Sequence, residues 1–499
     1  MRMNSATLLI AIPLLVAFTQ PIIGMFSKKA TKVVTFLTIL YNFIFGITIF
    51  SKVLKSGPLV AVIGNWKPPF GINLYMDAFS MFIATTIYFV GLLVAFYFIG
   101  KEDTEVDAKA SLILLLLIAA SGGMVLTGDI FNMFVFIEIT SISTYAFVAY
   151  RKTGKAFKGS IKYMIVGSLS SSLFLLAIAF LYGSIGTLNL AEIALKFHTL
   201  NPYMASVIVT LFGTSLLLEA EIFPFNMWLP DVYDGAHSYT GALLSGVVGT
   251  AGIYALLRLM ATIFSVQGSI FGQLNFNAVL IVLGAMTVTI GELSALSQKN
   301  LKRILAYSSM SQMGIVVLAL GIASQSALYG GIFHVFNHAI AKSLLFLTAG
   351  IIITSLKTTN IDEMEGFGRK NPLIAIIFSI GTFSIIGLPF FSGFWSKMYI
   401  IKAAVQGNGW TIFALTFVLA SIIIESFYYF RIIYKFFVDK KVETKGKSNF
   451  FQYATVLVLA AIILYIGFNP SVLQNILNSA LKGLQDKSQY ISTVMGLVR

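Results

Sequence analysis

The sequence is built from apolar segments of about twenty residues, the length that an α-helix needs to cross the hydrocarbon core of a bilayer. About fourteen segments reach that length, at positions 6–26, 32–51, 77–99, 110–127, 130–150, 160–183, 204–223, 240–265, 277–297, 301–323, 325–356, 372–404, 410–437 and 451–469. Charged residues make up only 11% of the chain, against about a quarter in soluble domains. The sequence therefore predicts an all-α polytopic membrane protein in contact with a lipid bilayer. The first segment lacks a small-residue cleavage site, so we expect a retained helix rather than a signal peptide.

Lys and Arg are concentrated in every second connection between these segments, with clusters at 28–32, 151–158 and 435–447. Such clusters mark cytoplasmic loops, so we expect a multi-pass protein of the cell membrane with both termini outside. The seventh connection is an exception, because it holds Asp231 and Asp234 and neither Lys nor Arg. The net charge of +14 is assigned to the basic loops, and no nucleic-acid partner is expected.

One stretch, 216–241, places carboxylates beside prolines in apolar surroundings. Glu219 and Glu221 shortly precede Pro224, and Pro230 follows. Proline removes a helical hydrogen bond, and a broken helix at membrane depth is tolerated only against protein or a water-filled cavity. In transporters, such breaks hold ions and protons. With a second break at 387–389, the sequence predicts an ion-translocating protein with discontinuous helices 7 and 12.

The chain has no cysteine and only four histidines. We therefore expect no iron–sulfur cluster, no metal site and no cofactor in this chain. Redox chemistry, and with it any enzymatic activity, would belong to a partner subunit.

A weak internal duplication suggests four regions. They are an N-terminal unit of three helices with an external hairpin (1–109), two five-helix repeats (110–266 and 267–437), and a cytoplasmic loop with a C-terminal transmembrane helix (438–499). Because five is odd, consecutive repeats would be inverted in the membrane. Inverted repeats place binding sites at their interface near the bilayer midplane.

Six motifs carry a resemblance to a known family. They are GDIFNMFVFIEI (128–139), FPFNMWLPDVY (223–233), KNLKRILAYSSMSQMG (299–314), HVFNHAIAKSLLFLTAG (334–350), IDEMEGFGRKNP (361–372) and GLPFFSGFWSKM (387–398). In this order they resemble the antiporter-like subunits of respiratory complex I, Mrp-type cation/proton antiporters and membrane-bound hydrogenases, over roughly residues 70–440. The sequence FNMFVFIE within the first motif is most similar to the Mrp D-type and hydrogenase large subunits. The resemblance implies two inverted five-helix repeats, two half-channels and a polar axis across the membrane centre.

In the first half, the resemblance marks Glu138 as the family's key glutamate. Where the family has a lysine on helix 7, this sequence has Glu219, and the family lysine of helix 8 falls at Thr250. Glu138 and Glu219 would then form a carboxylate pair that shares a proton or holds a cation. The pair could bind Na⁺, carry protons by another route, or mark a half that has lost pumping. Lys162 is a candidate partner for Glu138, or a lysine that snorkels to the cytoplasmic interface.

In the second half, His334, His338 and Lys342 follow at intervals of four residues and share one helix face. Histidine titrates near neutral pH and can relay protons. Lys397 matches the family's terminal charged residue on helix 12. Accessory ionisable candidates are Glu221, equally open to a structural or interface role, and Glu292 and Glu425.

These patterns favour a proton- or Na⁺-translocating subunit of a multisubunit redox-linked complex, such as a membrane-bound hydrogenase or a complex I relative. Its partners would be small antiporter-type subunits and hydrogenase-like redox subunits. One alternative is a subunit of a stand-alone Mrp-type Na⁺/H⁺ antiporter. The other is a non-pumping scaffold, which the missing lysines of helices 7 and 8 favour.

Overall fold

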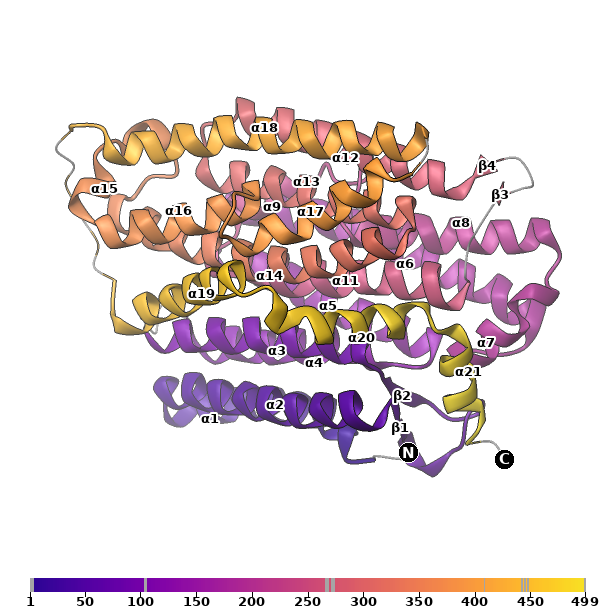
Figure 1. Ribbon diagram of the computed structural model, residues 1–499. Helices are drawn as coiled ribbons and strands as arrows, with labels where there is room; N and C mark the ends of the chain where they lie inside the picture. Colours follow the sequence, from indigo (N-terminus) through magenta and orange to yellow (C-terminus); the bar gives the residue numbers. More distant parts are fainter. Residues whose placement is uncertain are drawn as a thin grey trace.

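A computed structural model describes residues 4–102, 106–264, 269–270, 274–407, 409–440, 443, 446 and 448–497. Most helices lie roughly parallel and form one bundle (Figure 1). Within the described residues, thirteen helices are long and apolar enough to cross a membrane, or up to fourteen if a bent pair counts as one span. The predicted all-α membrane architecture is confirmed.

The N-terminal unit and the first half contain α1 to α11. Their bounds are α1 Leu8–Phe26, α2 Lys28–Ser56, α3 Ala78–Ile99, α4 Ala108–Leu126, α5 Ile130–Ala149, α6 Gly154–Ile185, α7 Leu190–Lys196, α8 Pro202–Glu219, α9 Leu229–Gly235, α10 Ser238–Leu243 and α11 Gly249–Leu257. Short 3-10 turns lie at Asn4–Thr7, Ile63–Asn65 and Phe197–Thr199. Predicted helix 7 (204–223) therefore corresponds to α8, and α9 lies beyond the break, in the predicted seventh connection. Predicted helix 8 runs from α10 through the π-helical turn η4 (Leu244–Val248), α11 and a second π-helical turn, η5 (Arg258–Ile263).

The second half and the C-terminal part contain α12 to α21. Their bounds are α12 Phe276–Ser297, α13 Leu301–Ile322, α14 Gln325–Leu356, α15 Phe367–Lys370, α16 Pro372–Ile386, α17 Ser392–Val405, α18 Gly409–Phe437, α19 Phe450–Phe468, α20 Ser471–Gln485 and α21 Lys487–Met495, with a 3-10 turn at Ile361–Met364. Predicted helix 12 is α16 plus α17. The amphipathic α20 and the short α21 were not predicted from the sequence.

A hairpin is present between α2 and α3, where the sequence predicts one. Strands β1 (Leu59–Val62) and β2 (Asn73–Met76) pair antiparallel, with Leu59 opposite Met76. A second pair, β3 (Ser269–Ile270) and β4 (Leu274–Asn275), is also antiparallel. Both termini lie toward the right of Figure 1, whereas α15 lies at the left. The termini and α15 thus lie at opposite ends of the bundle.

The same local feature, an isolated β-bridge beside a helix start, occurs in both halves. Asp129 forms an isolated antiparallel bridge with Asn189, and Asn300 forms the same kind of bridge with Asn360. Asp129 caps the first turn of α5, and Asn300 caps the first turn of α13. In each half, a bridge thus ties the start of one helix to a short helical segment about sixty residues later.

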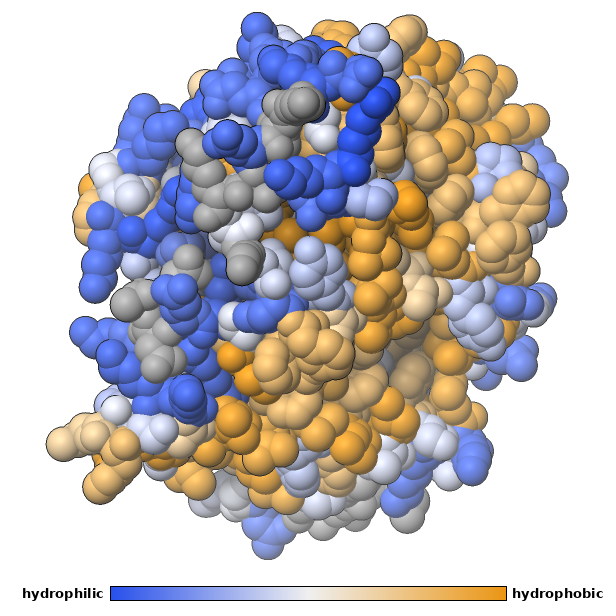
Figure 2. Space-filling view, turned by 90° about the vertical axis from the view of Figure 1, so that its left-hand side faces the viewer, coloured by the Kyte–Doolittle hydropathy of each residue, from blue (hydrophilic) through white to orange (hydrophobic). Residues whose placement is uncertain are grey.

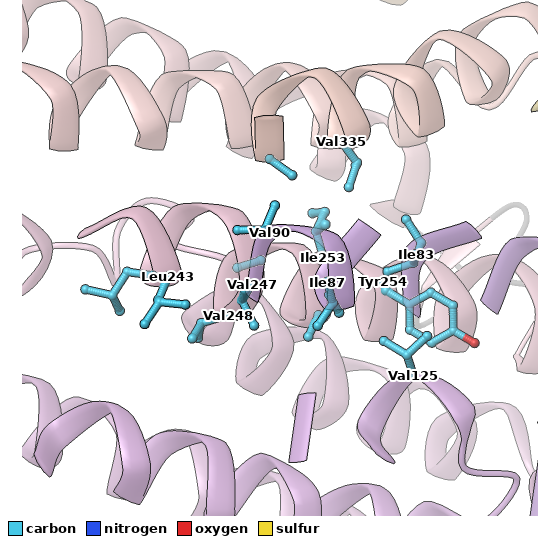
Figure 3. Close-up of a cluster of buried hydrophobic side chains, with 14 of the residues drawn as sticks. Ile83, Ile87, Val90, Val125, Leu243, Val247, Val248, Ile253, Tyr254 and Val335 are labelled. Carbon is cyan, nitrogen blue, oxygen red and sulfur yellow. The ribbon is translucent and has the colours of Figure 1, made fainter. Parts of the chain in front are cut away.

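Predicted helix 8 lies in the centre of the molecule and is buried along its length. Figure 3 shows Val247, Val248 and Ile253 from this helix among apolar side chains of α3, α4 and α14. At the end of the same helix, Arg258 is buried and forms a two-pronged ion pair with Asp77 at 2.7 and 2.8 Å. Arg258 also donates to the backbone carbonyl of Gly483 in α20, at 2.9 Å. Arg258 thus anchors the end of helix 8 to the start of α3 and to α20.

Candidate ion-translocation site

The break in predicted helix 7 sends its two carboxylates in different directions. Helix α8 ends at Glu219, and Glu221 adopts a left-handed backbone conformation with φ of +65°. Both side chains are buried. The backbone of Gly252 approaches the Glu219 carbonyl so closely that an added Cβ would lie 3.1 Å from its oxygen. The glycine thus lets helix 8 pack directly against the end of α8.

Glu219 faces the first half. Its carboxylate lies within electrostatic range of Glu138, and Tyr145 lies near both carboxylates. Glu138 is half-buried, and its Oε1 atom is enclosed without a hydrogen-bond partner among the described residues. The arrangement brings together the two residues of the predicted carboxylate pair.

Lys162 does not serve as the partner of Glu138. Its Nζ atom lies 2.5 Å from Asp231 Oδ2, and Arg303 of α13 binds the other oxygen of Asp231. Of the two roles left open for Lys162, the partnership with Glu138 is not formed, because α6 aims Lys162 at α9 rather than at α5. The same contacts explain the acidic seventh connection, whose charge is balanced by cations of α6 and α13. Asp234 follows the same pattern, with Lys155 at 3.4 Å.

A further ion-pair network lies at this end of the bundle, outside the spans. Asp362 pairs with Lys299 and Lys435, each at 2.9 Å. Hydrogen bonds from these two lysines hold the pKa of Asp362 below its ordinary value. The network joins the start of α13 to the end of α18.

Glu221 faces the centre and the second half. Its Oε1 accepts a hydrogen bond from Tyr233, at 3.2 Å. Tyr233 contacts Ser245 of η4 at 2.8 Å, and Ser245 contacts Ser309 of α13 at 2.9 Å. These contacts place Glu221 between the two halves, within a hydrogen-bonded group that includes η4 and α13.

The predicted trio of α14 is buried on one side of that helix. Lys342 donates to Ser308 at 2.7 Å and to Tyr429 at 3.3 Å. His334 shares a hydrogen bond of 3.0 Å with Ser396 of α17. Both ring nitrogens of His338 lack a partner among the described residues, and His338 lies within electrostatic range of Lys342 and His334.

Asn337 of α14 holds the break in predicted helix 12. Its Oδ1 accepts hydrogen bonds from Ser384 before the break at 2.7 Å, and from Ser392 after it at 2.6 Å. Gly387 closes α16 with φ of +87°, a conformation that glycine adopts without strain. These side-chain hydrogen bonds tie both sides of the break to α14.

Lys397 of α17 forms a buried ion pair. Its Nζ lies 2.8 Å from Glu425 Oε2, and the two side chains are 2% and 0% exposed. Gln312 binds the other Glu425 oxygen. Glu292 is fully buried within electrostatic range of Glu425, and its carboxylate has no hydrogen-bond partner among the described residues. Glu425, predicted only as accessory, is thus central.

The neutral residues that hold these charges were not predicted from the sequence. They are Ser308, Ser309, Gln312, Tyr233, Ser245, Asn337 and Tyr429. Gln312, Ser308 and Ser309 stand in the apolar face of a spanning segment, where a polar side chain requires a partner. Polar residues within an apolar spanning segment could therefore have identified these three side chains from the sequence.

Thr250, at the position of the family's helix 8 lysine, is fully buried, and its hydroxyl has no partner among the described residues. Val247 and Ile253 from the same helix belong to the apolar cluster of Figure 3. Helix 8 therefore carries no ionisable side chain at this level of the bundle.

A cavity of about 500 Å³ opens at the end of the bundle where α3 and α14 finish. Its lining includes Arg151, Lys302, Asp234 and Lys357. Figure 2 views this end, where hydrophilic side chains gather over one part of the face and apolar ones cover the other. The cavity reaches the polar ends of both halves.

Comparisons with known proteins agree with this architecture. A family model described as "NADH:quinone oxidoreductase/Mrp antiporter, TM" matches residues 127–423. The D-type subunit of the Na(+)/H(+) antiporter of Alkalihalophilus pseudofirmus is 30% identical over 98% of this chain and 99% of that protein. The N-type subunit of the NADH-quinone oxidoreductase of Desulforudis audaxviator is 28% identical over 95% of this chain and 98% of that protein.

A solved structure extends the comparison. One chain of the membrane-bound sulfane sulfur reductase, an archaeal respiratory membrane complex, is 37% identical, with a TM-score of 0.92 over 99% of this chain and 100% of that chain. The resemblance drawn from the motifs is confirmed. The chain belongs to the NADH:quinone oxidoreductase/Mrp antiporter family and is a multi-pass membrane subunit of the antiporter type.

Proposed function

We propose that the chain moves protons or Na⁺ within a multisubunit, redox-linked membrane complex. The residues that would carry the ions are ionisable side chains of both halves: Glu138, Glu219, Glu221, His334, His338, Lys342, Lys397, Glu292 and Glu425. The Lys397–Glu425 pair carries this proposal. Burying two charges in a membrane protein is costly, and intramembrane charges serve ion pathways by default. A complex related to membrane-bound hydrogenase or complex I would supply the redox partners, and the membrane would be the cell membrane with both termini outside.

The first half supports a role for the carboxylate pair. Two carboxylates that lie near each other cannot both ionise cheaply, so Glu138 and Glu219 would share one proton or hold a cation. Either state gives this half an ion site without the family's lysine.

Two alternatives remain open to experiment. A stand-alone Mrp-type Na⁺/H⁺ antiporter uses the same fold, and proteins that co-purify distinguish it from a redox-linked complex. Small antiporter subunits alone would favour the antiporter, and iron–sulfur or hydrogenase-like subunits would favour the complex. A non-pumping scaffold is favoured by Glu219 and Thr250, which stand where the family has lysines.

Substituting Glu138→Gln tests the first half. The complex is reconstituted in sealed vesicles, and proton uptake is followed with a pH-sensitive dye in Na⁺ or K⁺ buffer. Because glutamine cannot release a proton or carry a negative charge, transport should fall at least about tenfold, which corresponds to about 1.4 kcal/mol in the barrier.

The exposed Glu363 provides the matched control. Glu363→Gln should transport at the rate of the unmodified complex. Equal rates for the two variants would show that the first half takes no part in transport. A dependence of the unmodified complex on Na⁺ would identify Na⁺ as the coupling ion.

A further inference from the structure

The cavity of about 500 Å³ at the end of the bundle has a strongly cationic lining. Asp234 is the one carboxylate among the described residues that line it, and it already pairs with Lys155 and Arg303, at 3.4 and 3.6 Å. A hollow lined by charges of one sign concentrates ions of the other sign, so the cavity attracts anions. The cationic lining residues are Lys101, Arg151, Lys155, Lys302 and Lys357.

Lys302 is a buried cation of this lining that has no counter-ion. It is only 2% exposed, and its Nζ donates to the backbone carbonyls of Asp234 and Ala236 at 2.7 and 2.6 Å. No carboxylate of the described part of the chain lies within ion-pair distance of this ammonium. An ammonium has three N–H groups, so one remains for a ligand. A buried charge is costly until an opposite charge compensates it, and an anion in the cavity would do so.

Two further cations converge on the same place from the first half. Arg151, which follows α5, donates through Nη1 to the carbonyls of Asp234 and Gly235 at 3.3 and 3.2 Å. Arg151 and Lys155 both lie within electrostatic range of Lys302. Like charges held this close repel one another, and an anion between them would turn that repulsion into attraction.

The start of predicted helix 8 contributes to the same cavity. The helix spans Ser238–Ile263, and no side chain caps its first turn. Ser238 itself lines the cavity. The first N–H groups of a helix lack intrahelical partners and, together with the helix dipole, favour a bound anion. The helix start and the cations therefore select the same kind of ligand.

We propose that this cavity binds a phosphate group. Phosphate offers several acceptor oxygens at once, which suits donors that approach from different elements. An arginine can pair with two of these oxygens, and lysines act as point charges around them. Basic pockets between the ends of transmembrane helices bind lipid phosphates, and a phosphate ion from the aqueous phase presents the same chemistry.

The bound phosphate would join the two halves of the chain. Arg151 and Lys155 lie around the turn from α5 to α6, whereas Lys302 begins α13 and Lys357 follows α14. Each half thus supplies cations to one ligand. Because a ligand that binds only the folded protein stabilises it, phosphate should raise the unfolding temperature more than chloride does at equal ionic strength.

Replacing two exposed lysines of the lining tests the site without disturbing the core. The variant is Lys155→Gln/Lys357→Gln, and the purified protein in detergent, stripped of lipid, is titrated calorimetrically with sodium phosphate at constant ionic strength. The dissociation constant should rise at least about tenfold, because two charge-assisted hydrogen bonds are lost. Lys302→Met, which removes the buried charge, should weaken binding at least as much.

The matched control removes the same charge from the same turn. Lys152 and Lys158 are exposed and do not line the cavity, so Lys152→Gln/Lys158→Gln should bind phosphate like the unmodified protein. Equal weakening in the two double variants would show a general effect of surface charge and would overturn the site.

A second measurement identifies the source of the phosphate. The protein is reconstituted in phosphatidylcholine vesicles with or without phosphatidylglycerol, returned to detergent, and weighed by native mass spectrometry. Retention of phosphatidylglycerol by the unmodified protein and the control, but not by Lys155→Gln/Lys357→Gln, would assign the site to a lipid headgroup. Binding of sodium phosphate without lipid retention would assign it to a soluble phosphate.

An unmodified protein that binds neither sodium phosphate nor phosphatidylglycerol would overturn the proposal. Both measurements record binding rather than transport. The phosphate site therefore stands or fails independently of the proposed function.

Discussion

Replacing Lys397 by alanine should lower proton-coupled transport in sealed vesicles by at least about 100-fold, which corresponds to an increase of about 2.7 kcal/mol in the activation barrier. The ammonium of Lys397 lies 2.8 Å from Glu425, and both side chains are buried. Removing one partner of a buried ion pair leaves an uncompensated charge, at a cost of about 3–5 kcal/mol. Glu425 avoids this cost by taking up a proton and keeping it, so it can no longer exchange protons along the pathway.

Lys402 offers the matched control, because it lies on the same helix, α17, and is exposed. Lys402→Ala should leave transport unchanged. If Lys397→Ala and Lys402→Ala transport equally well and both complexes assemble, the pathway does not pass through the pair. The scaffold alternative would then be favoured for the second half.

Replacing Arg258 by alanine should give the largest loss of stability, about 3–5 kcal/mol, because it leaves Asp77 buried without its partner. Arg258 joins the start of α3, the end of helix 8 and α20. Its guanidinium also lies over the rings of Phe79 and Tyr254, at 5.2 and 5.5 Å. The measurement is the thermal unfolding temperature of the purified protein in detergent, which should fall clearly.

Two further variants define the cause. Arg369 pairs with Asp439 at 2.9 Å on the surface, and exposed pairs contribute about 0–1 kcal/mol, so Arg369→Ala should unfold near the unmodified temperature. Arg258→Met combined with Asp77→Asn should recover part of the loss, since it leaves no unpaired charge. An Arg258→Ala protein as stable as Arg369→Ala would show that the buried pair contributes little.

Much of the fold follows from local sequence. Apolar length predicts a spanning helix because every backbone group in lipid must be bonded internally. Prolines and glycines at 224, 387 and 389 predict the interruptions because they cannot continue a regular helix. The four-residue spacing of His334, His338 and Lys342 predicts a shared face because it matches the helical repeat. These features depend on neighbours within a few residues.

The partners of the charged side chains were decided by tertiary structure alone. The sequence indicated Lys162 for Glu138, but the packing of α6 on α9 gives Lys162 to Asp231. The sequence marked Glu425 only as an accessory candidate. The packing of α18 beside α17 places it in an ion pair with Lys397.

The same division applies to the broken helix. The sequence by itself determined that carboxylates and an interruption coincide near Pro224. Only the three-dimensional arrangement decided that Glu219 faces the first half and Glu221 the second, because the left-handed turn at Glu221 separates two side chains. A helical repeat fixes which residues share a face, whereas the rotation and depth of each helix against its neighbours depend on the packing of the whole bundle.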